Sequence, residues 1–199
     1  MGCGGTGDGE AQEQPSLDWR SVAQPVRLNL GAGGKTIPGF YSVDLANNAS
    51  GIKPDFDCDL RRLPFPDDWA EEIIAVHVIE HFYIWEVADV LKEWQRVLKP
   101  GGRLIVECPC LEKVMHFFHL ASTGQAKVDF QCLWLALYGD PSSKTVEMTH
   151  KWCYGIGQIK QLFRTVGFTG VSREEAVYHM PARDMRIIGY KQEFRDGTE

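Results

Sequence analysis

A short apolar run that ends in a glycine turn constrains the fold of this 199-residue chain more than any other feature. Residues 26–34 read V-R-L-N-L-G-A-G-G, and the next apolar run, Y-S-V-D-L at 41–45, carries an acidic residue, Asp44, near its end. Glycine lets the backbone turn tightly and approach a ligand closely. A carboxylate at the tip of a neighbouring parallel strand can accept both hydroxyls of a ribose. The pair therefore predicts one half of a nucleotide-type binding site.

Apolar segments alternate between strand and helix periodicity from residue 25 onward. Strands are predicted at 26–30, 40–44, 72–76, 102–107, 169–177 and 184–191, and a late helix at 156–166. The clearest helix precedes the 102–107 strand, and the motif Pro100-Gly101-Gly102 is expected to end it. Its apolar residues at helical spacing are Val87, Val90, Leu91, Trp94, Val97 and Leu98. This alternation predicts a single α/β domain over 25–199 with a doubly wound, mostly parallel sheet, preceded by a tail at 1–24 that is flexible or forms a short capping helix.

Residues 111–149 interrupt the alternation. This segment is rich in aromatic and apolar residues and is too long for an ordinary connection, so we expect a helical cover inserted after the fifth strand and able to exclude water from the cleft.

Composition limits the classes of partner. The net charge of −6 disfavours a nucleic-acid substrate, and no apolar run reaches the roughly 20 residues that a membrane span needs, so we expect a cytoplasmic protein. The six cysteines form no C-x-x-C pair and are expected to be structural thiols. The N-terminal M-G-C-G-G-T fits a loose myristoylation pattern, but an ordinary tail is favoured.

Four motifs in order resemble those of the class I S-adenosylmethionine-dependent methyltransferases, in particular small members whose first motif reads L-N-L-G-A-G. After the glycine turn come D-C-D-L-R-R-L-P-F at 57–65, E-E-I-I-A-V-H-V-I-E-H-F at 71–82 and L-K-P-G-G-R-L-I-V-E at 98–107. The resemblance is strong over 26–108 and weak over 150–191. It implies a Rossmann-like seven-stranded sheet, S-adenosylmethionine as cofactor and methyl transfer to an acceptor.

The resemblance also implies roles for individual residues. The first motif would face the methionine part of the cofactor, Asp44 the ribose hydroxyls, Asp59 and Leu60 the adenine amino edge, and His77 the sulfonium. The residues of the first motif with this role are Asn29, Leu30, Gly31, Ala32 and Gly33. Leu45 is a further cofactor-binding candidate. Asn29 stands where many relatives carry an acidic residue, which weakens a charged contact to the methionine ammonium.

The spacing after the glycine turn argues against a dinucleotide cofactor. Asp44 follows Gly31 by 13 residues, whereas about 20 are expected after a dinucleotide fingerprint, and Thr36 occupies the position of the third glycine. The first helix must therefore be very short or replaced by a turn.

Histidine is the natural general base at neutral pH, so His77, His81 and His150 are the candidate catalytic residues. His116 and His119 could line the pocket. Arg183, Asp184 and Arg186 could bind an anionic acceptor, but a surface ion pair is favoured.

The sequence predicts methyl transfer to an oxygen or nitrogen of a small molecule, such as a saccharide or biosynthetic intermediate, by in-line displacement with a histidine base and no metal. Two alternatives stay open. One is a non-catalytic protein that binds S-adenosylmethionine or its demethylated product. The other is a zinc hydrolase built on the motif His77-x-x-Glu80-His81, which resembles a metalloprotease signature; it is disfavoured because His77 should end a strand. The oligomeric state is left open.

Overall fold

The computed structural model describes residues 17–48 and 50–193, and its centre is one seven-stranded sheet of order β3-β2-β1-β4-β5-β7-β6. The strands are β1 (Arg27–Leu30), β2 (Tyr41–Asp44), β3 (Phe56–Asp57), β4 (Ala70–Val76), β5 (Leu98–Pro109), β6 (Phe168–Glu174) and β7 (Asp184–Lys191). The first five strands are parallel, and β7 is antiparallel to both β5 and β6. The predicted mostly parallel seven-stranded α/β fold is confirmed.

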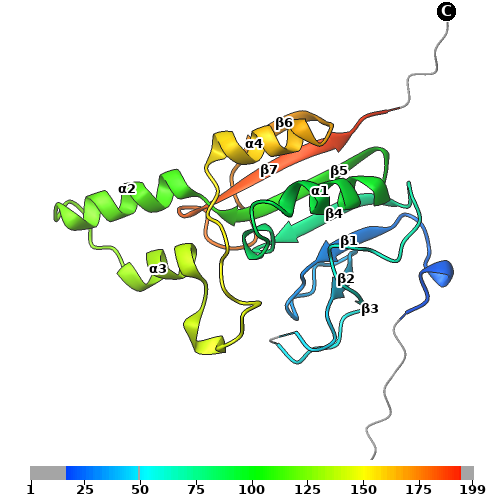
Figure 1. Cartoon of the computed structure of the whole chain (residues 1–199), viewed down its shortest axis with the longest axis horizontal. Coiled ribbons are helices and arrows are strands. Elements are labelled where there is room, and N and C mark those ends of the chain that lie inside the picture. Colours follow the sequence, from blue (N-terminus) through cyan, green and yellow to red (C-terminus); the bar gives the residue numbers. More distant parts are fainter. Residues whose placement is uncertain (1–16, 49, 194–199) are drawn as a thin grey trace, which may run out of the picture.

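Within residues 17–48 and 50–193, four α-helices connect or extend the strands: α1 (Val87–Val97), α2 (Leu111–Ser122), α3 (Phe130–Tyr138) and α4 (Ile156–Thr165). Three short 3-10 helices are η1 (Trp19–Ser21), η2 (Ile79–His81) and η3 (Pro141–Ser143). Figure 1 shows α1 and α4 beside the sheet, whereas α2 and α3 lie beyond it. No helix in the described part of the chain combines the length and the apolar character that a membrane crossing would need.

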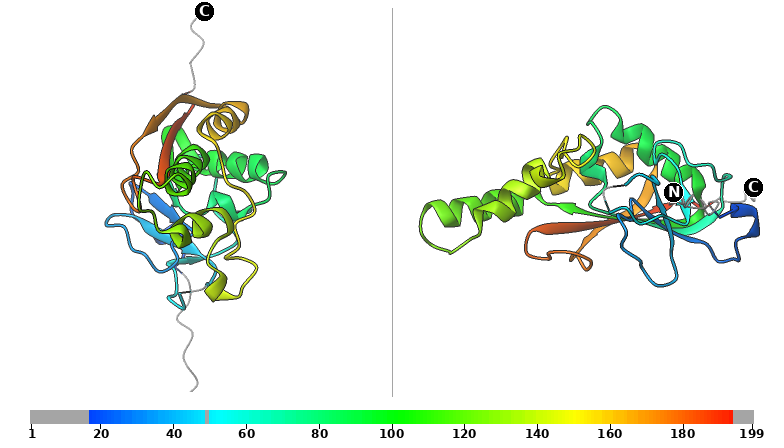
Figure 2. Two further views of the ribbon diagram at one scale, coloured as in Figure 1. Left: turned by 90° about the vertical axis from the view of Figure 1, so that its left-hand side faces the viewer. Right: turned by 90° about the horizontal axis from the view of Figure 1, so that it is seen from below.

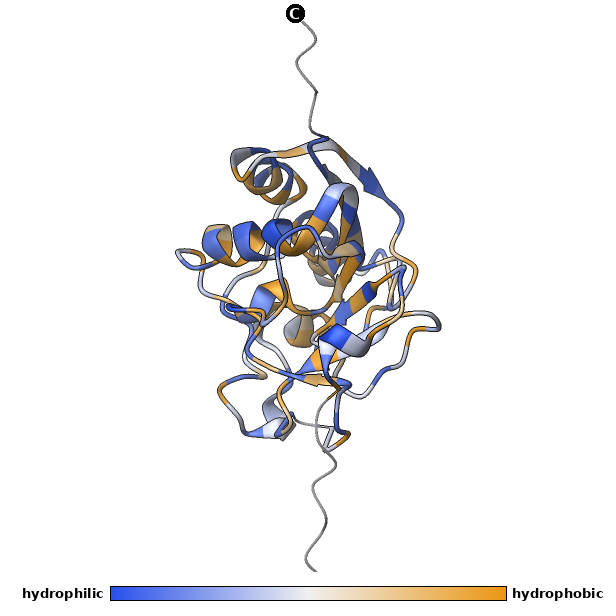
Figure 3. Cartoon of the chain, turned by 90° about the vertical axis from the view of Figure 1, so that its right-hand side faces the viewer, coloured by the Kyte–Doolittle hydropathy of each residue, from blue (hydrophilic) through white to orange (hydrophobic). Residues whose placement is uncertain are grey.

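The main core lies between the sheet and the two helices α1 and α4. Trp94 of α1, Phe163 of α4 and Leu104 of β5 are completely buried there. Figure 3 shows apolar residues gathered between sheet and helices, with hydrophilic residues on the outer helix faces. Burial of these large side chains, at about 25 cal/mol per Å², is the main driving force for assembling the layers.

The opposite face of the sheet has a much thinner cover. Figure 2 shows α1 and α4 on the same side of the sheet. On the other side, Ile74, Ile105 and Ile188 are buried by a small cluster that includes Ile37 and Phe40 from the connection between β1 and β2. That connection contains turns and no helix, as its short length predicts.

Element boundaries agree with the sequence within a few residues, with two exceptions. Helix α1 ends at Val97, because Leu98 already has extended backbone (φ −66°, ψ 140°) and begins β5. The prediction that Leu98 belongs to the helix is wrong; the residue is buried in either case, so periodicity could not separate the two structures. The two-residue strand β3 was not predicted as a separate element.

The segment 111–149 is helical, as expected, and folds largely onto itself. Helices α2 and α3 share a small apolar cluster of Val114, Leu133 and Ala136. The right-hand view in Figure 2 shows α2 projecting from the sheet. Both ends of the segment are held at one place, since Leu111 N–H donates to Tyr154 O at 2.9 Å and Cys110 pairs with Tyr154.

Part of the predicted N-terminal tail packs on the domain. Residues 17–24 include η1, whose Trp19 ring lies edge-on to Trp69 with centroids 6.0 Å apart. This favours the capping helix over a flexible lead-in for that part. The myristoylation pattern and Cys3 lie outside the described residues. The five described cysteines are free thiols, and burial raises the pKa of Cys108 and Cys110, in keeping with a structural role.

Candidate functional site

The glycine turn after β1 is held in place by close packing. Gly31 has φ +62°, and a Cβ added there would lie 2.5 Å from Val78 Cγ2. A side chain is therefore excluded both by the left-handed backbone and by lack of space. The amide of buried Asn29 donates to Lys35 O at 3.0 Å. Asn29 thus fixes the turn from within, a contact that does not require an acidic residue.

Asp44 joins the glycine turn to the end of β2. Its Oδ2 accepts a hydrogen bond from Gly33 N–H at 2.7 Å, and its Oδ1 accepts one from Leu45 N–H at 2.8 Å. The carboxylate is half-buried. Each of its oxygens has a second lone pair, so the group can still accept the two hydroxyls of a ribose.

Leu45 and Asp59 stand close in the sheet order, after β2 and β3. Leu45 is 41% exposed although it is a large apolar residue, and Asp59 has an exposed carboxylate that accepts from Arg61 N–H at 2.9 Å. Leu60 is held by its backbone, since its carbonyl accepts from Trp94 Nε1 at 2.9 Å. An apolar side chain beside a carboxylate fits the face and the amino edge of a purine ring.

These residues fit the cofactor that the sequence resemblance implies. The bare backbone of Gly33 has open space beside it, because an added Cβ there would meet nothing nearer than Gly31 O at 3.9 Å. Asp44 offers oxygen acceptors, and Leu45 offers apolar surface. The turn has no α-helix N-terminus to hold phosphate, which agrees with a phosphate-free nucleoside ligand. The donor and acceptor groups of these residues match those of the cofactor, and the role of each residue stays a prediction.

His77 lies immediately after β4 and bridges two buried carboxylates. Its Nδ1 is 3.0 Å from Glu80 Oε1 and its Nε2 is 2.9 Å from Asp184 Oδ2. Its backbone is left-handed (φ +57°), a conformation that is costly for most residues but less so for His. Burial lowers its pKa, but hydrogen bonds to Asp184 and Glu80 outweigh this and raise the pKa to about 9. His77 is therefore protonated at neutral pH.

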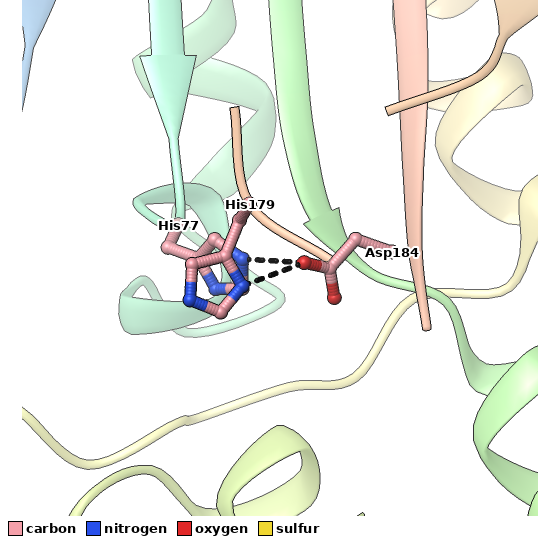
Figure 4. Close-up of side chains that lie close together, drawn as sticks. All are labelled: His77, His179 and Asp184. Carbon is pink, nitrogen blue, oxygen red and sulfur yellow. Dashed lines mark hydrogen bonds and ion pairs between the residues drawn. The ribbon is translucent and has the colours of Figure 1, made fainter. Parts of the chain in front are cut away.

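Asp184 begins β7 and has a full set of donors. Arg183 Nε donates to its Oδ1 at 2.7 Å, and Met180 N–H donates to its Oδ2 at 3.2 Å. Figure 4 shows His77 and His179 directed at one oxygen of the carboxylate. Burial raises the pKa of Asp184, but its hydrogen bonds to His77 and Arg183 lower it far more.

Arg183 and Asp184 form the predicted ion pair, with Nε and Oδ1 2.7 Å apart, but the prediction that it lies on the surface is wrong. Arg183 is 6% exposed and Asp184 is fully buried, and the pair closes the end of the β5–β7 ladder. Arg186 is also part-buried, and it donates to the buried carboxylate of Glu107 at 2.6 Å. Neither arginine is free to bind an anionic acceptor.

Glu80 forms a second cluster with His81 and His150. Glu80 is 1% exposed, and one ligand-type atom from each of the three residues lies within 4.8 Å of the others. The imidazole rings of His81 and His150 stand edge to face, 4.8 Å between centroids. Burial lowers the pKa of His150, which favours its neutral form. A backbone hydrogen bond holds His150 near Glu80, because Lys151 N–H, from the next residue, donates to Glu80 O at 2.7 Å.

The structure therefore brings the three predicted histidines together and leaves two others apart. His116 and His119 are exposed on α2, so they do not line this site. The sequence analysis assigned no role to His179, and it considered Glu80 only as part of the zinc motif His77-x-x-Glu80-His81. The sequence signal that could have marked Glu80 as a site residue is its position between His77 and His81. No local pattern links its distant partner His150 to that motif.

Comparison with known proteins agrees with the fold. A family model described as a methyltransferase domain matches residues 40–106. A probable S-adenosylmethionine-dependent methyltransferase of Mycolicibacterium smegmatis is 39% identical over 51 residues, which cover 26% of this chain and 19% of that protein. The matched stretch is thus less than a fifth of the length of that relative.

Solved structures resemble nearly the whole chain. A methyltransferase from Archaeoglobus fulgidus that depends on S-adenosylmethionine has a TM-score of 0.56 at 14% identity, covering 83% of this chain and 85% of that one. Another, from Thermotoga maritima, has a TM-score of 0.55 at 16% identity, covering 87% and 85%. Identities this low establish the fold alone. Together the matches confirm the resemblance to S-adenosylmethionine-dependent methyltransferases.

Proposed function

We propose that this protein, which has the methyltransferase fold, transfers a methyl group from S-adenosylmethionine to an oxygen or nitrogen of a small-molecule acceptor. The observation that carries the proposal is the Asp44 carboxylate, held at the end of β2 by the N–H of Gly33. This hydrogen bond places a carboxylate that can accept ribose hydroxyls next to a glycine turn whose backbone a ligand can approach closely. The acidic net charge supports a small molecule rather than a nucleic acid.

The methyl transfer itself demands little covalent chemistry from the protein. The cofactor supplies a methyl carbon already activated by positive sulfur, so the chain has to hold the acceptor in line with the carbon–sulfur bond. Strands β1 and β4 are neighbours in the sheet, and the turns that follow them touch at Gly31 and Val78. Cofactor and acceptor would therefore meet at the carboxyl edge of these two strands.

The three predicted histidine bases are not equally suited to accept a proton. His77 has both ring nitrogens beside carboxylates and a raised pKa, so it suits the general-base role poorly. In His150, Nδ1 contacts the Ala136 carbonyl at 2.9 Å, which leaves Nε2 as the free acceptor nitrogen. The general-base role stays a prediction for His81 and His150.

Binding of the cofactor tests the proposal directly. Calorimetric titration with S-adenosylmethionine and S-adenosylhomocysteine should show saturable binding to the wild-type protein. Asp44→Ala should weaken it by about 1–3 kcal/mol, because the ribose hydroxyls lose a charged acceptor. The matched control is Asp89→Ala, since the Asp89 carboxylate is exposed on α1 and pairs with Lys92.

Either of two results would contradict the cofactor assignment: no binding of either compound, or equal binding by Asp44→Ala and Asp89→Ala.

A non-catalytic binding protein is the second candidate, and it predicts the same titrations. It differs in showing no methylated product when the bound complex is offered a panel of hydroxyl and amine acceptors with labelled cofactor.

A further inference from the structure

We propose that Glu80, His81 and His150 bind a divalent transition-metal ion, with zinc as the representative. Two imidazoles and one carboxylate form a common ligand set for catalytic zinc, which leaves a fourth position for water or substrate. The inference departs from the sequence-based expectation of no metal. It also differs from the zinc alternative considered there, since His77 is not a ligand and Glu80 is one.

The first argument is that the polar atoms of this cluster lack partners. Glu80 Oε2 and His81 Nδ1 are buried without a hydrogen-bond partner among the described residues. The close approach of His77 Nδ1 to Glu80 Oε1 at 3.0 Å is an ion pair, and it leaves the second oxygen of Glu80 without a counterpart. Buried polar atoms are almost always satisfied, so these atoms point to a bound ligand.

The second argument is the orientation of His150. Its Nδ1 lies 2.9 Å from Ala136 O, and a carbonyl can only accept, so the proton must be on Nδ1. Its Nε2 then carries a free lone pair and lies 4.0 Å from Glu80 Oε1. Histidines that bind metal commonly donate their other ring N–H to a backbone carbonyl in this way. In the same way, the contact of His77 with Glu80 would orient the Glu80 carboxylate toward the ion.

The neighbouring cluster of His77, His179 and Asp184 does not meet these conditions. Its ligand-type atoms are equally close, but Arg183 Nη2 lies 3.1 Å from Asp184 Oδ2 and 3.0 Å from His179 Nδ1. A guanidinium already supplies positive charge where a cation would have to sit. In the Glu80 cluster the nearby positive group is His77, which contacts only Oε1 of Glu80 and leaves Oε2 of Glu80 and Nδ1 of His81 open to a cation.

The position of the proposed ion suggests the class of acceptor, an inference that rests on the proposed methyl transfer. Glu80 is two residues from Val78, which packs against Gly31 of the cofactor turn. A divalent ion there could bind an acceptor hydroxyl and ease loss of its proton to water. Water would then replace His81 and His150 as the base, because the metal would occupy their lone pairs. The oxygen would then attack the methyl carbon while the carbon–sulfur bond breaks with its electrons left on sulfur. Alcohol or vicinal-diol acceptors are thus favoured over amines.

Metal titration of the chelator-treated, full-length protein tests the site without the cofactor. We expect one equivalent of Zn²⁺ to bind, and Co²⁺ to give the visible absorption bands of a low-coordinate site. Glu80→Gln and His150→Ala should each weaken Zn²⁺ binding by more than about 100-fold, since loss of even an outer partner of a ligand costs about 10–100-fold. His116→Ala is the matched control, because His116 is exposed on α2.

Three outcomes would overturn the metal site. They are no Zn²⁺ or Co²⁺ binding by the wild-type protein, unchanged binding by Glu80→Gln and His150→Ala, or loss of binding in His179→Ala, which would place the ion in the other cluster. Retained S-adenosylmethionine binding in the Glu80 and His150 variants shows that they fold. Metal binding without cofactor binding would sink the proposed function and leave the metal site standing.

Discussion

Two buried carboxylates lie on opposite sides of one imidazole, and they are satisfied in opposite ways. Asp184 has polar contacts with Arg183, His179, Met180 and His77. Among the described residues, the Glu80 carboxylate has one close ion pair, with His77, and its Oε2 has no hydrogen-bond partner. A fully satisfied buried carboxylate stabilises the fold around it, but an unsatisfied one costs free energy unless a ligand completes it. The comparison indicates that the Asp184 cluster is a structural unit and that the Glu80 cluster is built to bind.

The largest effect is expected from removing Asp184. Asp184→Ala leaves the guanidinium of Arg183, 6% exposed, without its counter-charge, and breaking a buried pair in this way costs about 3–5 kcal/mol. Urea denaturation followed by tryptophan fluorescence measures the loss against Asp89→Ala. A loss below about 1 kcal/mol would remove the distinction between the two clusters.

A smaller loss is expected at the contact between the cofactor turn and the Glu80 segment. Gly31→Ala and Gly33→Ala both place a side chain at positive φ, which costs about 1–2 kcal/mol, but only the Gly31 variant also meets Val78, at 2.5 Å. The unfolding free energy of Gly31→Ala should therefore be lower than that of Gly33→Ala by about 1–3 kcal/mol. The same urea denaturation experiment measures both.

The double variant Gly31→Ala, Val78→Ala isolates that contact. If steric overlap is the cause, removing the Val78 methyl groups should recover part of the additional loss, with Val78→Ala alone as the reference. Equal stabilities of the Gly31 and Gly33 variants would mean that the two turns are not tightly packed against each other.

The smallest effect on stability is expected from Glu80→Gln. In the metal-free protein this substitution removes a buried charge that has one ionic partner, and His77 keeps its contact with Asp184. The change in unfolding free energy should be within about 1 kcal/mol, because the lost ion pair and the relieved desolvation oppose each other. Added Zn²⁺ should raise the midpoint of the wild-type protein and not that of Glu80→Gln.

Much of the fold could be predicted from the sequence because the signals are local. The alternating run before Gly31 and the helical spacing of Val87, Val90 and Leu91 each specify an element within a few residues. Asp44 was recognisable because its position depends only on two adjacent strands, β1 and β2.

Long-range contacts were harder to predict. His150 is held near Glu80, about 70 residues away in the sequence, because the next two residues, Lys151 and Trp152, donate backbone hydrogen bonds to Glu80 O. No sequence periodicity indicates such a contact. Arg183 and Asp184 looked like surface residues because charged neighbours beside a turn usually are. Their burial depends on His77 and His179 converging from other parts of the chain.

The meeting of Cys110 and Tyr154 at the base of the helical segment has an evolutionary consequence. A segment whose two ends lie side by side can change in length at a small entropic cost of loop closure, about 0.6 kcal/mol for each doubling of a flexible loop. We expect homologues to exchange the segment between these two residues as a cassette. Selection could then reshape what stands over the carboxyl edge of the sheet while the seven strands stay as they are.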